Sequence, residues 1–241
     1  MMKFHGCAMT AVVLLATAGA AHAAQLVVID AKGSISKTTP IGSVIDDANL
    51  DVQDHDQLTV MTATGETIQV DGPHKGPVGA PTGGDPGMLQ KLSNVMKDRQ
   101  ASFGATRNVM LQTDPGEHKA DPWAIDASFS STACVFEGRP AQLFLPKSAN
   151  ASSVTVKDET SGKSATIDWP TDGSNAAWPA SLPAVDGDQY TVSFGASHRT
   201  LTVKKVSAAT SEGMGSLLAA GAGCNGQAKD LARAAKPVKA S

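Results

Sequence analysis

Seven short runs of β-branched and aromatic residues dominate residues 122–206 and constrain what this segment can fold into. They occupy residues 123–127, 133–136, 141–145, 153–157, 164–169, 189–194 and 199–206. Turn signals such as Ser161-Gly162 and Asp186-Gly187 separate them. Short strands at a spacing of about 8–12 residues are typical of a sandwich. We therefore predict an Ig-like β-sandwich over 122–206, with the stretch around Trp178-Pro179 as a crossover loop packed on its core.

A smaller β-unit is predicted at 24–73. Residues 26–31 (LVVIDA) form a β-branched run, and two further runs at 58–63 and 67–70 flank Gly65. A strand, a short glycine turn and a second strand indicate a β-hairpin. The fold class expected from both units is mainly β, with short helices in the linker and at the C-terminus.

Residues 74–121 are predicted to be a Pro/Gly-rich linker containing one short amphipathic helix. Residues 72–87 hold six glycines and four prolines, a density at which we expect no regular element. Asp85-Pro86 then offers a helix start, and apolar residues at helical spacing predict a helix over 87–100. Val109-Met110-Leu111 could form a short strand.

Residues 207–241 are alanine-rich and are predicted to be a helical tail. Ser207 or Thr210 could cap a first helix. Glycines near Cys224 would break the helix, and a second helix would end before Pro237. The expected result is a helical hairpin with Cys224 near its bend.

Residues 1–23 have the pattern of a secretory signal peptide. Lys3 precedes an apolar run over 7–20, and Ala21-His22-Ala23 is an A-x-A cleavage signal that would leave Ala24 as the first mature residue. The competing interpretation is a membrane anchor, but the run of about 14 residues is shorter than the about 20 that a spanning helix needs. The sequence thus predicts a periplasmic or secreted protein without a membrane span after cleavage.

Two cysteines, Cys134 and Cys224, remain in the predicted mature chain. In an oxidising compartment they allow one internal pairing, and closing a loop of about 90 residues would contribute about 4–5 kcal/mol in the chain-entropy model. The alternative is redox catalysis, which favours a C-x-x-C spacing that the chain lacks. We predict a structural disulfide that ties the C-terminal segment to the middle of the chain.

Charge and composition exclude some classes of function. The chain has 20 Lys and Arg against 23 Asp and Glu, for a net charge of -3. Proteins that bind nucleic acid through phosphate neutralisation are more basic, so no nucleic-acid partner is expected. With 41% hydrophobic residues, the chain is also too apolar to be wholly disordered.

Two clusters of carboxylates with a histidine could suggest a cation site. One comprises Asp114, Glu117, His118 and Asp121, and the other is Asp54-His55-Asp56. Prolines and a glycine around the first cluster favour a polar loop. Neighbouring residues on an extended chain point to opposite faces, so the second cluster is also predicted to be a polar turn. We expect no metal and no cofactor.

Two short motifs have spacings that also occur in catalytic or phosphate-binding sites, and we interpret both as structural. Ser34-x-x-Lys37 has the spacing of penicillin-binding enzymes, but the segment looks extended and the partner motifs are missing. Gly83-Gly84-x-x-Gly87 lacks the preceding strand and following lysine of a phosphate loop, so a linker is favoured. We predict no catalytic residues, and the sequence leaves the binding residues unknown.

Four aromatic residues could be either core or a carbohydrate platform. They are Trp123, Trp169, Trp178 and Tyr190. Rings in a sandwich are mostly core, whereas a platform needs two or more of them exposed on one face. The sequence favours the core and leaves the platform open.

The N-terminal unit resembles FecR-type periplasmic β-domains. The matching residues are Gly33, Gly42-x-Val44-Ile45, Leu58-Thr59-Val60-Met61, Gly65 and Thr67-Ile68-x-Val70-x-Gly72. The whole chain is similar to uncharacterised exported proteins of proteobacteria, through Trp169-Pro170, Trp178-Pro179, Leu182-Pro183, Asp186-Gly187, Tyr190 and the cysteine of the helical C-terminus. The resemblance implies envelope signalling and protein contacts, and brings no catalytic residues.

Three functions are therefore considered. The leading hypothesis is a non-enzymatic scaffold or signalling module that binds another envelope protein. The second is a periplasmic protein that binds a carbohydrate or a small ligand, and the third is a hydrolase whose residues converge only in the fold. The oligomeric state is left open.

Overall fold

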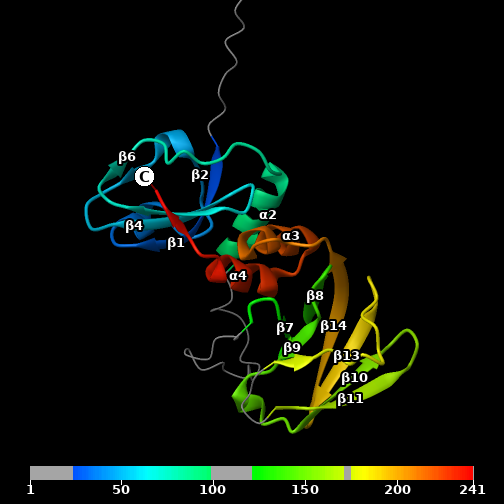
Figure 1. Ribbon diagram of the computed structural model, residues 1–241. Helices are drawn as coiled ribbons and strands as arrows, with labels where there is room; N and C mark the ends of the chain where they lie inside the picture. The colour runs from blue at the N-terminus through cyan, green and yellow to red at the C-terminus, as the bar shows by residue number, and fades with distance from the viewer. Residues whose placement is uncertain (1–23, 99–120, 171–174, 241) are drawn as a thin grey trace, which may run out of the picture.

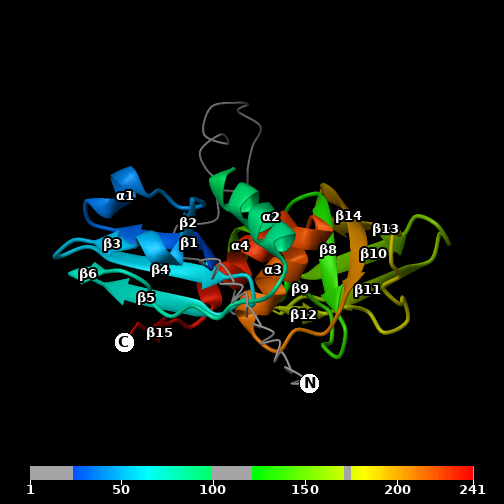
Figure 2. The same ribbon diagram turned by 90° about the horizontal axis from the view of Figure 1, so that it is seen from above.

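Two β-units lie at opposite ends of the molecule, and a layer of three helices lies between them (Figures 1 and 2). The structure is a computed structural model that describes residues 24–98, 121–170 and 175–240. The predicted cleavage residues Ala21 and Ala23 and the possible strand at 109–111 fall outside these ranges. The fold is mainly β with four α-helices among the described residues, as the sequence predicts.

The N-terminal unit is built on a five-stranded sheet in the order β15-β5-β4-β1-β2. The strands are β1 Gln25–Lys32, β2 Val44–Asp46, β4 Gln57–Thr62, β5 Thr67–Asp71 and β15 Val238–Lys239. The predicted hairpin is confirmed, because β4 and β5 pair antiparallel around the turn at Gly65. One face of the sheet covers an aliphatic core that includes Leu26, Val60 and Val70.

Smaller elements close this unit on its far side. They are the helix α1 Ile35–Thr38, the 3-10 turn η1 Asp47–Asn49 and the paired strands β3 Asp51–Val52 and β6 His74–Lys75. Strand β6 corrects the expectation that residues 72–87 hold no regular element. The Asp47 carboxylate also accepts hydrogen bonds from the backbone N–H groups of Val78 and Ala80, at 2.7 and 3.3 Å. Residues 74–80 thus pack on the N-terminal unit as part of it.

The C-terminal unit is a sandwich of two sheets. The larger has the order β11-β10-β13-β14-β8 and the smaller β12-β9-β7. Their bounds are β7 Ile125–Asp126, β8 Ser131–Phe136, β9 Gln142–Phe144, β10 Ser153–Asp158, β11 Ser164–Asp168, β12 Ala176–Ala177, β13 Gln189–Phe194 and β14 Ser197–Val206, with a 3-10 turn η2 at Lys147–Ala149. All seven predicted runs contain strands, and their inward residues form one core. Strand β8 joins β14 in parallel.

Two of the described helices begin at side-chain caps. Helix α2 spans Pro86–Lys97 and begins after Asp85, whose carboxylate accepts from the Gly87 N–H at 2.7 Å. Helices α3 Glu212–Ala222 and α4 Asn225–Ala234 form the predicted hairpin around Cys224. The predicted cap was wrong, since neither Ser207 nor Thr210 begins α3. Ser211 does, and its hydroxyl accepts from the Met214 N–H at 3.2 Å.

The helical layer has a core of its own that joins both β-units. Val27 and Met61 contribute from the N-terminal sheet, Leu92 and Leu231 from the helices, and Phe136 from the sandwich. The predicted disulfide between Cys134 in β8 and Cys224 between α3 and α4 is present, with a Cα–Cα distance of 5.8 Å. The two β-units therefore have separate cores, and this third core holds them together.

A close backbone contact locks the N-terminal unit to α3. The turn residue Gly65, at φ +81°, lies against the first turn of the helix, and a methyl group at Gly213 would overlap the Gly65 carbonyl oxygen. Only glycine permits both the left-handed backbone and this approach. The contact fixes the hairpin tip on the helical layer.

Candidate functional site

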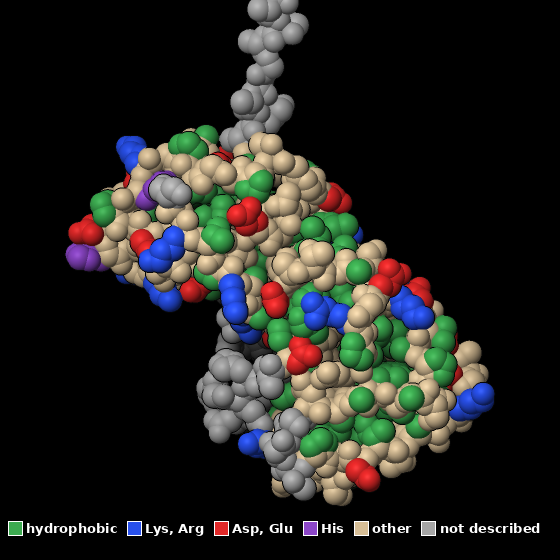
Figure 3. Space-filling model, in the orientation of Figure 1, with side chains coloured by type: hydrophobic (Ala, Val, Ile, Leu, Met, Phe, Trp, Pro, Cys, Tyr) green, Lys and Arg blue, Asp and Glu red, His purple; other side chains and the backbone are tan. Residues whose placement is uncertain are grey.

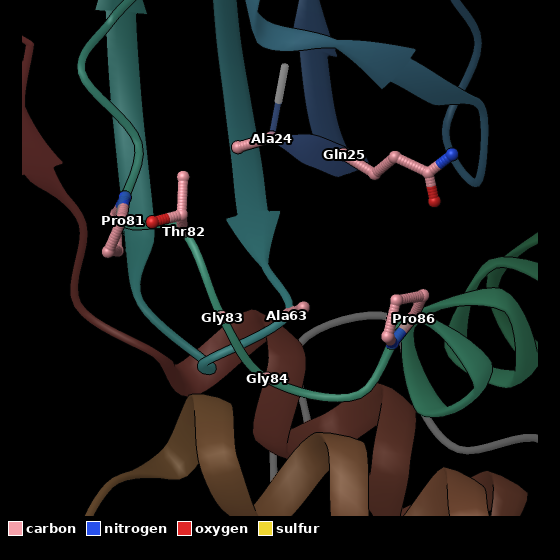
Figure 4. A pocket seen from close by; sticks show the side chains of 8 residues that line it. All are labelled: Ala24, Gln25, Ala63, Pro81, Thr82, Gly83, Gly84 and Pro86. Atoms are coloured by element: carbon pink, nitrogen blue, oxygen red, sulfur yellow. The ribbon is translucent and has the colours of Figure 1, made fainter. Parts of the chain in front are cut away.

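Candidate binding sites in the structure include a hollow on the N-terminal unit and an open strand edge on the sandwich. Figure 4 shows the hollow, which has a volume of about 410 Å³. The start of β1, the residue after β4 and the loop before α2 line it, through Ala24, Gln25, Ala63, Pro81, Thr82, Gly83, Gly84 and Pro86. None of these side chains is ionisable, so the lining of the hollow suits an uncharged group.

Ser34 and Asp56 form a structural contact that the sequence did not reveal. The segment of Ser34-x-x-Lys37 was expected to be extended, but Ile35–Thr38 is the helix α1. Asp56 is 5% exposed and accepts from the Ser34 N–H at 2.6 Å and from the Ser34 hydroxyl at 2.8 Å. The hydrogen bond from the Ser34 hydroxyl lowers the pKa of Asp56 more than any other contact. The serine is thus a hydrogen-bond donor to a carboxylate whose lowered pKa makes it a weak general base.

The cluster at 54–56 does not gather into a cation site, and most of the other cluster lies outside the described residues. Asp54 and His55 pair with each other on the surface at 3.2 Å, while Asp56 turns inward to Ser34. Of the other cluster, Asp114, Glu117 and His118 lie outside the described residues. Asp121 accepts a hydrogen bond from the Trp123 N–H at 3.0 Å. In the described parts of the chain no group of three or more His, Cys, Asp and Glu could hold a metal ion.

Three of the four large rings are core residues, so they cannot form a carbohydrate platform. Trp169 and Trp178 are 6% and 9% exposed, and Tyr190 is fully buried. The Trp178 indole donates to the Leu182 carbonyl at 2.6 Å, and its ring meets Tyr190 edge-on at 5.0 Å. The crossover loop therefore packs on the core as predicted. Burial raises the pKa of the Tyr190 hydroxyl.

Trp123 is half-buried at the border between the sandwich and the helices. Its ring meets Phe136 edge-on at 4.8 Å, and the Arg139 guanidinium lies over it at 3.8 Å. The indole is thus engaged within the chain by one aromatic ring and one cation, which gives it a packing role at this border.

Charged side chains are scattered over the face shown in Figure 3. Positive and negative groups alternate there, and no patch of one sign stands out on that face. Among the described residues, no helix has the length and apolar character needed to cross a membrane.

A buried glutamine covers the β8 edge of the larger sheet of the sandwich, the sheet with the order β11-β10-β13-β14-β8. Gln227 of α4, 4% exposed, accepts from the Cys134 N–H at 2.6 Å and donates to the Cys134 carbonyl at 3.0 Å. The same amide nitrogen donates to the Trp123 carbonyl at 3.0 Å. The side-chain amide therefore imitates the next strand of the sheet, with one acceptor and one donor.

The opposite edge of this sheet, at β11, is open in the described part of the chain, where no further strand pairs with it. Figure 1 shows β11 as the outermost strand, on the side of the sheet away from β8. Hydrogen bonds from Trp169 N–H to Ser152 and from Asp158 N–H to Lys163 fix which residues bond to β10. Because bonding alternates along an antiparallel strand, the backbone groups of Ser164, Thr166 and Asp168 point away from β10. All three residues are exposed.

The turn before β11 is held by Asp158. This carboxylate is 8% exposed and accepts from the Ser161 hydroxyl at 2.6 Å and the Thr160 N–H at 2.8 Å. The hydrogen bond from the Ser161 hydroxyl is the main reason that the pKa of Asp158 lies below its ordinary value. On the outer face, the hydroxyls of Thr155 and Thr166 bond at 2.8 Å. These hydrogen bonds within the chain fix the backbone conformation of the open edge without a partner.

Sequence reasoning found the disulfide but missed both the covered and the open edge. The sequence pattern of a strand does not show whether that strand lies at the edge of a sheet. The sequence of a helix does not show which distant group a polar side chain on the helix will bond to. The alternation of polar and apolar residues in Ser164-Ala165-Thr166-Ile167-Asp168 was the available signal, because it indicates a strand with one face toward water, and the structure shows only half-burial on the other face. Comparison with family models, curated proteins and solved structures finds no match to this chain.

Proposed function

We propose that this chain is a non-enzymatic protein-binding module of the cell envelope, and that its partner adds a strand to the open edge of β11. The observation that carries the proposal is the contrast between the two edges of one sheet. A buried amide covers β8, whereas β11 keeps three outward-facing residues in a preformed strand. Exposed edges are docking places for extended segments of other chains.

The rigid joining of the two β-units supports a scaffold role. The disulfide, the helical core and the contact between Gly65 and Gly213 link the N-terminal unit to the sandwich. A partner held at β11 would therefore stand at a fixed distance from any surface of the N-terminal unit. The FecR-type resemblance of that unit, which implies protein contacts, agrees with this role.

An envelope location is supported by two features. A disulfide fits an oxidising compartment, and residues 1–23 have the pattern of a cleaved signal peptide. We propose the periplasm or the cell exterior as the place where the chain works.

Photo-crosslinking in living cells tests the proposal. A photoreactive amino acid is placed at Thr166, and products are identified by mass spectrometry. The matched control carries it at Thr200, which is exposed on β14 in the interior of the same sheet. We expect a recurrent protein adduct from Thr166 and none from Thr200. No adduct from Thr166, or equal adducts from both positions, would overturn the proposal.

A proline variant tests whether main-chain pairing is the means of binding. Thr166→Pro removes an outward N–H, and the β10–β11 ladder does not use that group. Proline is tolerated at such edge positions. With the photoreactive residue moved to Ser164, Thr166→Pro should abolish the adduct while circular dichroism stays unchanged. An undiminished adduct would contradict strand addition.

A further inference from the structure

We infer that the strand added to β11 is the β11 of a second copy of this chain, so that two sandwiches share one ten-stranded sheet. This inference rests on the proposed function, because it names the partner at the same edge. It follows from the symmetry of the edge itself. The outward-facing residues are Ser164, Thr166 and Asp168, and they are evenly spaced about Thr166.

Antiparallel pairing about Thr166 uses every outward backbone group. It places Thr166 opposite Thr166 of the other copy, and Ser164 opposite Asp168 at both ends. In an antiparallel pair, opposed residues of this kind exchange both hydrogen bonds. Three such pairs satisfy all outward N–H and C=O groups of both strands. Two-fold symmetry requires this type of self-complementary surface.

The side chains on the two faces of β11 also fit a copy of themselves. On the outer face, Thr166 meets a threonine, and each Ser164 hydroxyl meets an Asp168 carboxylate. Cross-strand hydroxyl pairs and hydroxyl–carboxylate contacts of this kind stabilise sheets. On the face toward the sandwich core, Ala165 would lie opposite Ile167, and both are half-buried against that core. The second copy would complete the cover of these apolar groups.

The charge on the outward residues favours an antiparallel copy. Asp168 is the charged residue among the three, and it lies at the end of the strand. Antiparallel pairing about Thr166 places the two Asp168 carboxylates at opposite ends, each opposite a Ser164 hydroxyl. Parallel pairing in register would instead place the two Asp168 carboxylates directly opposite each other, which is destabilising.

The length of the strand sets the strength of the pair. A strand of five residues spans about 17 Å, so this pairing belongs to the small, transient class of interfaces. We expect a dimer that forms in a concentration-dependent manner. Sedimentation velocity over a range of concentrations should show it, and Thr166→Pro should remain monomeric throughout.

Cysteine crosslinking tests the register. Paired residues that exchange hydrogen bonds have Cα atoms about 5.5 Å apart, which a disulfide can bridge. Thr166→Cys should form a covalent dimer on mild oxidation, whereas Thr200→Cys, exposed on an interior strand, should not. Mixing Ser164→Cys with Asp168→Cys should give a heterodimer. Ser164→Cys alone should not, because its two copies would lie about 14 Å apart along the strands.

The outcomes separate this inference from the proposed function. Register-specific disulfides, together with an adduct at Thr166 in cells that has twice the mass of the chain, support both. An adduct to a different protein, with no Thr166→Cys dimer, overturns the second copy and leaves the protein-binding function standing. Absence of any adduct overturns both. Equal crosslinking of Thr166→Cys and Thr200→Cys would show random collision and would also overturn the inference.

Discussion

Gln227→Ala should be among the most destabilising substitutions in this chain. The wild-type side chain is 4% exposed and makes three hydrogen bonds, two with Cys134 and one with the carbonyl of Trp123. Alanine fits helix α4 well, so the helix itself does not suffer. The substitution leaves one backbone N–H and two carbonyl groups without partners at the junction of α4 and β8.

The expected loss follows from these three groups. Leaving a buried donor or acceptor unsatisfied costs about 1–3 kcal/mol. Because the groups share one site, the losses combine less than additively, and we expect about 3–4 kcal/mol in total. That is a large part of the about 5–15 kcal/mol by which ordinary domains are stable.

Urea unfolding of the oxidised protein, followed by tryptophan fluorescence, measures this loss. Gln90→Ala is the matched control, since Gln90 is exposed on α2 and its amide donates a hydrogen bond to Asn94 at 3.3 Å. It should change the free energy of unfolding by less than about 0.5 kcal/mol. A loss below about 1 kcal/mol for Gln227→Ala would refute the idea that this amide stabilises the β8 edge.

Gln227→Glu adds a pH test of the same contact. The carboxylate keeps an acceptor for the Cys134 N–H but loses the donors, and it faces two carbonyl oxygens. Burial and these oxygens should raise the pKa of the new side chain above its unfolded value. Its folded form then binds a proton more tightly than its unfolded form, so stability falls as the pH rises. The variant should be closer to wild type at pH 4 than at pH 7, and an equal deficit at both would contradict the geometry.

Three further predictions concern the disulfide, the contact between Gly65 and Gly213, and the Asp71 carboxylate. Replacing both bridged cysteines by serine should lower the free energy of unfolding by about 4–5 kcal/mol, because the bridge closes a loop of 90 positions. Urea midpoints measure this loss of stability. A loss below about 1 kcal/mol would contradict the prediction. Gly213→Ala should destabilise the protein by about 1–3 kcal/mol through overlap with the facing turn. Its control Gly226→Ala, with open space around it in α4, should be neutral or stabilising in the same assay; equal effects would refute the contact. Hydrogen bonds, first from Gln57, lower the pKa of Asp71 from 3.8 to about 2. The contribution of the Asp71 carboxylate to stability is therefore complete above pH 3.8 and lost as the pH falls through about 2. An NMR titration of this carboxyl group should have its midpoint at about 2. In Gln57→Ala the midpoint should move toward 3.8.

Local pattern predicts much of this fold. The hairpin around Gly65, the helix after Asp85 and the helical hairpin around Cys224 all lie where sequence periodicity and turn chemistry place them. Each is decided by residues close to one another in the chain. The cysteine pairing was predictable for a different reason, since only one pairing was open to the predicted mature chain.

Contacts between distant segments were not predictable. Strand β15 pairs with β5 through two residues, too few to give a strand pattern. Ser34 was expected on an extended chain, but Asp56 holds it at the start of a helix, and such a partner cannot be read from spacing. Gln227 has the propensity of an ordinary helix residue, and its role depends on a strand on another unit. The candidate edge at β11 depends in the same way on the order of strands in space.

The pairing of Val238 with Ile68 has a consequence for biosynthesis. A ribosome releases the hairpin of β4 and β5 long before it releases residue 238, so the outer edge of β5 has no neighbour during most of synthesis. An unpaired edge of this kind is a recognition feature for chaperones and a starting point for aggregation. A molecule shortened by proteolysis before residue 238 would expose it again. Strand β15 thus protects the β5 edge once residues 238 and 239 are present and paired.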